Sequence, residues 1–283
     1  MQKRTWKTNL FIVLMLLPAL LLSLGIIAYP MLNTVLKSFR NAEGAFTLEN
    51  YKFLFTDTIA LQNIWFTFWV TIVTVLLAIA FAYVLSLFLR FSEGRISKII
   101  GALYLLPRFV PTLVAIYAMM TIVRDSGFLN RLSQLFGYDF KPGLLFNPKG
   151  IIMMNLWFNI PFAAMIISAS LAGIPNSVVE SARDVGANKL SVFFKMIVPL
   201  SIKDVLIAMT FVFMGNISSF TTPYLIGPNH PMMLGVYLRR QFSTYMNYEL
   251  SAALSVVIFL FSSISAVVYL YTNLKEKEWE KVD

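Results

Sequence analysis

The sequence predicts an all-α membrane protein with six membrane-spanning helices. Of its 283 residues, 58% are hydrophobic and only 13% are charged, and the mean hydropathy is +0.72. A soluble domain carries about twice that share of charged residues. The apolar residues also gather in runs of about 20 residues, the length that crosses a bilayer as a helix. The predicted spans are 10–31, 64–89, 99–123, 151–171, 205–226 and 250–271.

Residue types that are absent or rare exclude several kinds of site. The chain has no cysteine and a single histidine, His230, which excludes a disulfide, a cysteine nucleophile and a Cys- or His-rich metal site. It has no Gly-x-x-x-x-Gly-Lys-Ser/Thr motif, so we do not expect it to bind ATP by that device. No catalytic residue is predicted. The net charge of +9 is explained by basic loops beside the spans, so no nucleic-acid partner is expected.

Basic and proline residues mark the boundaries in the first half of the chain. The first span (10–31) follows a short basic segment and shows no small-residue cleavage site, so we expect it to remain uncleaved. In the connection that follows, residues 46–55 have the aromatic spacing of a short surface helix. The second span ends at a basic turn, 90–98. The third span contains Pro107 and Pro111, and we expect its helix to be broken there.

Residues 174–200, called the polar segment below, separate the fourth and fifth spans and are too polar to cross a bilayer. They are predicted to form two short helices. Asn176 or Ser177 can cap the first helix, because a side-chain oxygen at that position accepts a bond from a free backbone N–H. Glu180 then falls in the first turn, where a carboxylate suits the positive end of the helix.

Gly186 is expected to break the polar segment. Glycine is the usual residue just past a helix end, where a left-handed or closely packed position is needed. Apolar residues at helical spacing follow it and predict the second short helix. Pro199 is expected to end that helix, because proline has no N–H to donate.

The order of residues in the polar segment resembles the EAA loop of the permease subunits of binding-protein-dependent ABC importers. That loop reads Glu-Ala-Ala, three residues, Gly-Ala, and further on an Ile-x-x-Pro or Leu-Pro ending. Here a serine replaces the first alanine of the triplet. The residues that match the motif or lie inside it are Glu180, Ser181, Ala182, Asp184, Gly186, Ala187 and Pro199.

The resemblance implies the type I ABC importer permease fold, with residues 1–283 as one transmembrane domain in the bacterial cytoplasmic membrane. The polar segment would be a cytoplasmic coupling helix that docks in a groove of an ATPase; an amphipathic helix on the membrane surface is the alternative. The implied partners are an ABC ATPase dimer, a second permease subunit in a heterodimer rather than a homodimer, an extracytoplasmic substrate-binding protein and membrane lipid. The ATPase would bind ATP and magnesium, so the chain is not expected to be an enzyme or to hold a cofactor.

The distribution of lysine and arginine predicts the orientation. Both terminal segments, the basic turn 90–98 and the polar segment lie on one side of the predicted membrane, and together they carry more basic residues than the other side. By the positive-inside rule both termini are cytoplasmic, an N-in/C-in topology. The polar segment is then also cytoplasmic, where an ATPase could reach it.

Two features of the spans predict a substrate pathway. Arg108 lies near the middle of the third span, where a charge is costly and usually lines a pathway or pairs with another group; snorkelling toward the cytoplasm is the alternative. The end of the fifth span is rich in neutral hydrogen-bonding groups, which either line the pathway or bond between helices. The predicted pathway residues are Arg108, Asn216, Ser219, Thr222 and Tyr224.

A secondary transporter is the alternative of another class. Such a protein typically shows paired repeats and ion-coupling carboxylates within its spans. We find no evident repeat in the sequence, and we predict no Asp or Glu in the interior of a span.

The nature of the cargo is indicated only by finer resemblances. Residues 182–201 and 220–227 resemble polyamine permeases, although the second stretch also occurs in iron and phosphonate relatives. Ser38-Phe39 after the first span is shared with sugar permeases. A polyamine or a related small charged solute is favoured, and sugar, iron and phosphonate importers stay open. In such systems an external binding protein largely chooses the substrate.

Overall fold

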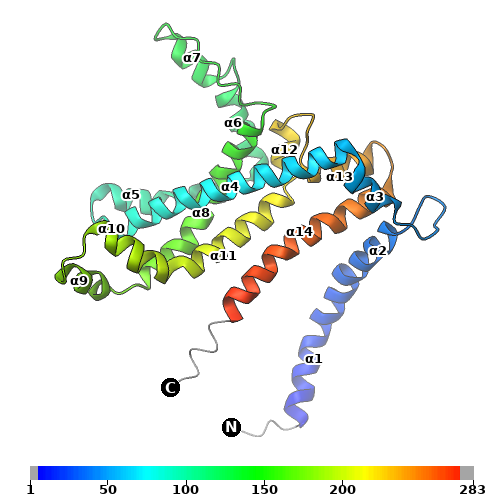
Figure 1. Cartoon of the computed structure of the whole chain (residues 1–283), viewed down its shortest axis with the longest axis horizontal. Coiled ribbons are helices and arrows are strands. Elements are labelled where there is room, and N and C mark those ends of the chain that lie inside the picture. The colour runs from blue at the N-terminus through cyan, green and yellow to red at the C-terminus, as the bar shows by residue number, and fades with distance from the viewer. Residues whose placement is uncertain (1–5, 275–283) are drawn as a thin grey trace. The chain divides into compact units, whose positions relative to one another are not determined.

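The computed structural model describes residues 6–274, and the regular secondary structure of these residues is helical, apart from one isolated bridge between Arg40 and Phe46 (Figure 1). The terminal residues that contribute to the orientation prediction, among them Lys3, Arg4 and the charged end of the chain at 275–283, lie outside the described residues. Six helical segments of the described part are long and apolar enough to cross a membrane, which confirms the predicted fold class. They are Phe11–Ser38, Thr58–Phe91, Thr112–Gln134, Pro148–Ala172, Lys189–Ile217 and Tyr248–Tyr271.

The chain divides into two compact units, residues 1–60 with 238–257, and residues 61–237 with 258–283. The expectation of one transmembrane domain over 1–283 therefore stays a prediction. In the first unit, the surface helix predicted within 46–55 forms as α3 (Glu49–Thr56). Its residues Asn50 and Tyr51 bond to the end of the preceding helix, Asn50 Nδ2 donating to the carbonyl of Ser38 at 3.0 Å. The helices of this unit before α3 are α1 (Trp6–Ser23), a π-helical turn (Leu24–Ala28) and α2 (Tyr29–Ser38).

The remaining helices follow in chain order. They are α4 (Thr58–Phe91), α5 (Arg95–Leu103), a 3-10 turn (Leu106–Phe109), α6 (Thr112–Val123), α7 (Phe128–Gln134), α8 (Pro148–Ala172), α9 (Asn176–Asp184), α10 (Lys189–Val192), a π-helical turn (Phe193–Ile197), α11 (Val198–Ile217), α12 (Thr221–Ile226), α13 (Leu234–Ser243) and α14 (Tyr248–Leu274).

The core of the second unit is formed where α4, α8 and α11 pack together (Figure 1). Alanines from all three helices lie in this contact, and Ala78, Ala164 and Ala208 are fully buried. Small side chains let helix backbones approach closely, which is how helices gain contact in a membrane where the lipid is as apolar as they are. The same core reaches the polar segment, because Val179 and Val192 belong to it. The polar segment is thus packed onto the spans by its apolar side.

The third span is broken as predicted. Helix α5 ends at Leu103, the 3-10 turn covers Leu106–Phe109, and α6 begins at Thr112. Val110 is extended, the conformation favoured before a proline, because the ring of Pro111 disfavours helical angles in the preceding residue. The helical span therefore begins at Thr112, not at 99, and α5 is a separate short helix.

The predicted fifth span, 205–226, is not one continuous helix. The chain is helical from Lys189 to Ile217, and α12 is a separate helix. The Ser218 hydroxyl at the end of α11 donates to the carbonyl of Met214 at 3.0 Å, and such side-chain bonds compete with a regular helix. Pro223 lies in the first turn of α12, where its missing N–H breaks no helical bond.

The prediction that Pro199 ends a helix is also wrong. The chain passes without interruption through a π-helical turn (Phe193–Ile197) into α11. Val198 donates its N–H to the carbonyl of Phe193, five residues back, and the Ser201 hydroxyl donates to the carbonyl of Ile197 at 2.8 Å. A widened turn of this kind accommodates the proline ring, which would clash in a regular α-helix. A π-helical turn also precedes Pro30 in the first unit.

Candidate functional site

The centre of the polar segment is the end of α9 at Gly186. Gly186 has φ +86°, and its N–H donates to the carbonyl of Arg183 at 2.8 Å, while the N–H of Ala187 donates to the carbonyl of Ala182 at 3.0 Å. This pair of bonds is the Schellman arrangement, which satisfies the last carbonyls of a helix and reverses the chain. A Cβ added to Gly186 would meet nothing within 4 Å. The glycine is therefore required for its left-handed backbone and not for space.

The residues of the resembling motif divide into a buried and an exposed set. Ala182 is buried in the core, which explains a small residue there. Glu180, Ser181 and Asp184 are exposed, so the serine that replaces alanine costs nothing in packing. Val185 is 86% exposed, which is unusual for an apolar side chain at the tip of a loop. The segment presents carboxylates and an apolar residue outward from a packed base.

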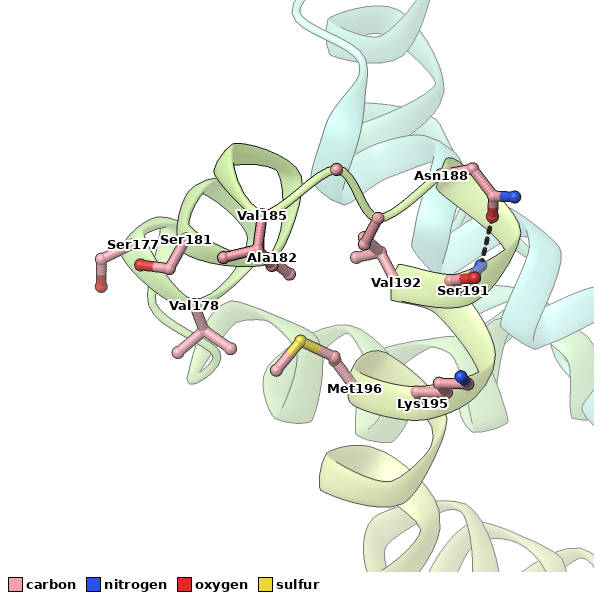
Figure 2. Close-up of a pocket in the computed structure, with 12 residues that line it drawn as sticks. Ser177, Val178, Ser181, Ala182, Val185, Asn188, Ser191, Val192, Lys195 and Met196 are labelled. Carbon is pink, nitrogen blue, oxygen red and sulfur yellow. Dashed lines mark hydrogen bonds between the residues drawn. The ribbon is translucent and has the colours of Figure 1, made fainter.

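A hollow of about 830 Å³ lies between α9 and α10, with the side chains around it shown in Figure 2. Asn188 caps α10, its Oδ1 accepting from the N–H of Ser191 at 2.8 Å. The hollow's walls combine apolar and neutral polar side chains, with Lys195 as the charged member. Its lining residues are Ser177, Val178, Ser181, Ala182, Val185, Gly186, Ala187, Asn188, Ser191, Val192, Lys195 and Met196.

Two local predictions about α9 are wrong. Pro175 occupies the N-cap position and no side chain caps the helix, because Asn176 is already the first helical residue and its Oδ1 accepts instead from Arg90. Glu180 is consequently the fifth residue of α9, and the first turn contains no acidic residue. The side chain of Glu180 is exposed.

Arg108 lies on an aromatic surface near the middle of α8. Its guanidinium carbon is 5.0 Å from the ring centre of Phe162, and Phe162 lies about ten residues, or about 15 Å, before the end of α8. That distance is half the thickness of a bilayer core of about 30 Å. Phe162 in turn packs edge-on against Phe211 of α11. The side chain of Arg108 is exposed, so the charge is available to a group outside this chain.

The other predicted pathway residues lie at the junction of α11 and α12. Asn216 is buried and bonds within its helix, Nδ2 donating to the carbonyl of Val212 at 2.7 Å. Ser219 is half-buried in the turn, and Thr222 is buried in α12. Tyr224 is half-exposed and its ring stacks on Phe220. The structure therefore places these groups along one bend, and Tyr224 is the most accessible of them.

Two charged residues were missed by the sequence reasoning. Asp204 lies inside α11, one residue before the predicted start of the fifth span, and is half-buried. The apolar periodicity from Leu190 onward could have revealed a continuous helix that includes it. Arg90 was taken only as part of a basic turn, and no sequence signal distinguishes it there. In the structure it bonds to both α8 and α9.

Comparison with known proteins adds a family, two curated relatives and a solved structure. A family described as "Binding-protein-dependent transport system inner membrane component" matches residues 78–280. The spermidine/putrescine transport system permease protein PotB of Escherichia coli is 23% identical over 225 residues, covering 79% of this chain and 82% of PotB. The sulfoquinovosyl glycerol transport system permease protein SmoG of Agrobacterium fabrum is 29% identical over 284 residues, covering 93% of this chain and 90% of SmoG.

The solved structure shares the fold. It is a bacterial alginate ABC transporter in complex with an alginate pentasaccharide-bound periplasmic protein. One of its chains aligns with 99% of this chain and over 99% of its own length, with a TM-score of 0.80 and 18% identity. The shared fold also includes the residues before 78, which the family match does not cover.

Proposed function

The chain belongs to the family of inner membrane components of binding-protein-dependent transport systems, and from this premise we propose that it is half of a translocation pathway driven by a separate ATPase dimer. It is a multi-pass permease of the bacterial cytoplasmic membrane and not itself an enzyme. The observation that carries the proposal is the shape of the polar segment. A short helix with exposed carboxylates turns at Gly186 into a helix that continues unbroken into a span.

The geometry suits the transmission of movement. Because α10, the π-helical turn and α11 are continuous, a displacement of the polar segment moves α11 as one rod. On the other side, α9 joins α8 through the short turn at Gly173–Pro175. Exposed apolar side chains at Val185, Leu190 and Phe194 offer a surface that a groove in an ATPase could cover. ATP and magnesium would bind to that ATPase, and no cofactor would bind to this chain.

The assembly that we propose contains two ATPases, a second and different permease subunit, and an external binding protein. The test is purification of the chain from its native host in mild detergent, followed by identification of the co-purifying subunits. We expect all three partners, and ATP hydrolysis that rises when loaded binding protein is added. If the chain purifies alone and transports its cargo in vesicles without ATP, the proposal is wrong and the chain is a secondary transporter.

We expect Glu180→Ala to weaken the association with the ATPase. Glu180 is exposed, so its loss would remove a partner contact worth about 1–3 kcal/mol if it pairs with a charged group. The measurement is the amount of ATPase that co-purifies with the chain. Glu43→Ala is the matched control, because Glu43 is an exposed carboxylate far along the chain from the polar segment. Equal recovery of ATPase with both variants would contradict a role of Glu180 in binding the ATPase.

For the cargo we propose a polyamine, with a sugar as the second candidate. The motif around 182–201 and the likeness to PotB support the polyamine, whereas the likeness to SmoG, which extends over more of the chain, supports a sugar derivative. The external binding protein recovered with the complex decides between them. Titration with putrescine, spermidine and hydroxyl-rich sugars should give saturable binding of the polyamines; binding of sugars alone would replace the polyamine with the second candidate.

Arg108 gives a prediction about the pathway itself. A unit positive charge in a low-dielectric span raises the free-energy barrier for the passage of a nearby cation by more than about 1.4 kcal/mol. That increase slows the passage about tenfold. Arg108→Gln should therefore raise the uptake of a cationic cargo by about tenfold or more. Arg131→Gln in α7 is the control, since Arg131 is exposed outside α6 and α8. Initial uptake rates at matched protein levels test this, and equal rates in both variants would remove Arg108 from the pathway.

A further inference from the structure

Arg90, in the last turn of α4, bonds to three acceptors on other segments. Its Nε donates to the carbonyl of Leu171 at 3.1 Å, and one Nη donates to the carbonyl of Ile174 at 3.1 Å and to Oδ1 of Asn176. Leu171 belongs to the last turn of α8, Ile174 to the connecting turn and Asn176 to the start of α9. A single guanidinium thus holds the whole corner between α8 and α9.

Apart from the core packing of Ile174 and Val179, few hydrogen bonds set the angle of this corner. The N–H groups of Gly173 and Ile174 bond back to the last turn of α8, but these bonds lie on the α8 side alone. The N-terminus of α9 has no side-chain cap. The guanidinium also places a positive charge at the carbonyl end of α8, where the helix dipole favours it. Because its donors are fixed in a planar fork, arginine can hold several acceptors in a defined geometry, whereas a lysine ammonium on a flexible stem defines no such geometry.

A second contact joins α4 to the other arm of the polar segment. The hydroxyls of Tyr83 and Ser201 are 2.7 Å apart, and the Tyr83 ring packs edge-on against Phe193 in the π-helical turn. Helix α4 is not adjacent in sequence to the polar segment, yet it touches both of its ends. Covalent continuity links that segment to α8 and α11 only, so α4 is joined to it by core packing and by these hydrogen bonds.

We propose that Arg90 is a positioning residue that couples α4 to the polar segment, so that α4 and α8 move together with α9. The proposal rests on the proposed function, since it assigns to Arg90 a part in the transmission of ATP-driven movement. Arg90 touches neither cargo nor ATPase in this role. Loss of Arg90 should leave ATP hydrolysis possible and lower the number of cargo molecules imported per ATP hydrolysed.

The test is the number of cargo molecules imported per ATP hydrolysed, measured with the whole complex in proteoliposomes. With Arg90→Gln and Arg90→Lys we expect this ratio to fall by about tenfold, the effect of losing a charge-assisted hydrogen bond, while hydrolysis continues. Arg95→Gln, an exposed arginine at the start of α5, should leave the ratio unchanged. A purely structural role would lower the yield of complex at a constant ratio, and a constant ratio in both Arg90 variants would overturn the proposal.

A second measurement does not depend on transport. The chain has no cysteine, so spin labels on Ser92→Cys and Ser177→Cys report the distance between the end of α4 and the start of α9 without a background signal. Arg90→Gln should broaden that distance distribution, and Arg95→Gln should not. An unchanged width of the distance distribution with Arg90→Gln would overturn the proposed role of Arg90. This outcome is independent of the proposed function, because it would hold even if the complex imported cargo without ATP.

Discussion

Replacing Gly186 with valine is expected to lower uptake by more than about tenfold while the subunit stays in the membrane. The left-handed conformation costs an ordinary residue about 1–2 kcal/mol, and a β-branched residue more. Gly186 has φ +86°, and the two bonds that close α9 depend on that angle. The valine would shift the loop to other conformations, and the exposed face of α9 would lose its alignment with the ATPase.

Gly137 offers a matched control for that experiment. It has φ +76°, and an added Cβ would also meet nothing within 4 Å, so Gly137→Val introduces similar backbone strain outside the polar segment. Uptake should survive in Gly137→Val. Gly186→Asn should retain part of the uptake, because asparagine tolerates the left-handed region better than valine. Normal uptake by Gly186→Val at normal protein levels would show that the angle at Gly186 is not needed for coupling.

Gly150→Ala is expected to give the largest loss of stability. A Cβ at Gly150 would lie 2.1 Å from the carbonyl oxygen of Leu144, closer than any real contact. The neighbouring loop cannot easily retreat, because the N–H of Phe146 donates to the carbonyl of Ile226 at 2.8 Å and Phe146 already has φ +56°. Overpacking of this kind costs about 1–3 kcal/mol or more, since backbone must move on one side or the other.

The measurement for Gly150→Ala is thermal unfolding of the purified subunit in detergent, together with its yield from membranes. Gly215→Ala is the control, since Gly215 is also helical but an added Cβ meets nothing within 4 Å. Alanine is the better helix former by about 1 kcal/mol, so Gly215→Ala should be neutral or stabilising. Equal unfolding temperatures for the two variants would contradict the steric argument.

Several features of this protein were determined by the sequence alone, because they depend on local chemistry. Long apolar runs have to form helices in a membrane, where every backbone group needs a partner, and this predicted six spans. Pro107 and Pro111 interrupt the third span for a reason contained in the proline ring itself. Gly186 takes the left-handed position expected of a glycine after a helix. The motif around Glu180 also identified the family before any comparison.

The errors arose where a residue had two chemically acceptable roles. Asn176 could cap α9 or accept a bond from a distant arginine, and the packing of α4 against α8 and α9 decided for the arginine. Pro199 could end a helix or follow a widened turn. The bond from Ser201 to Ile197 and the contact of Ser201 with Tyr83 favour the second.

The attachment of the polar segment to the spans depends on the tertiary structure. Local sequence specifies a short helix, a left-handed turn and a second helix, since each depends on a few neighbouring residues. It does not specify that the second helix runs unbroken into α11, nor that Arg90, more than eighty residues away along the chain, holds the corner between α8 and α9. Those features depend on which helices meet, and helices separated in sequence meet only through the packing of the whole core.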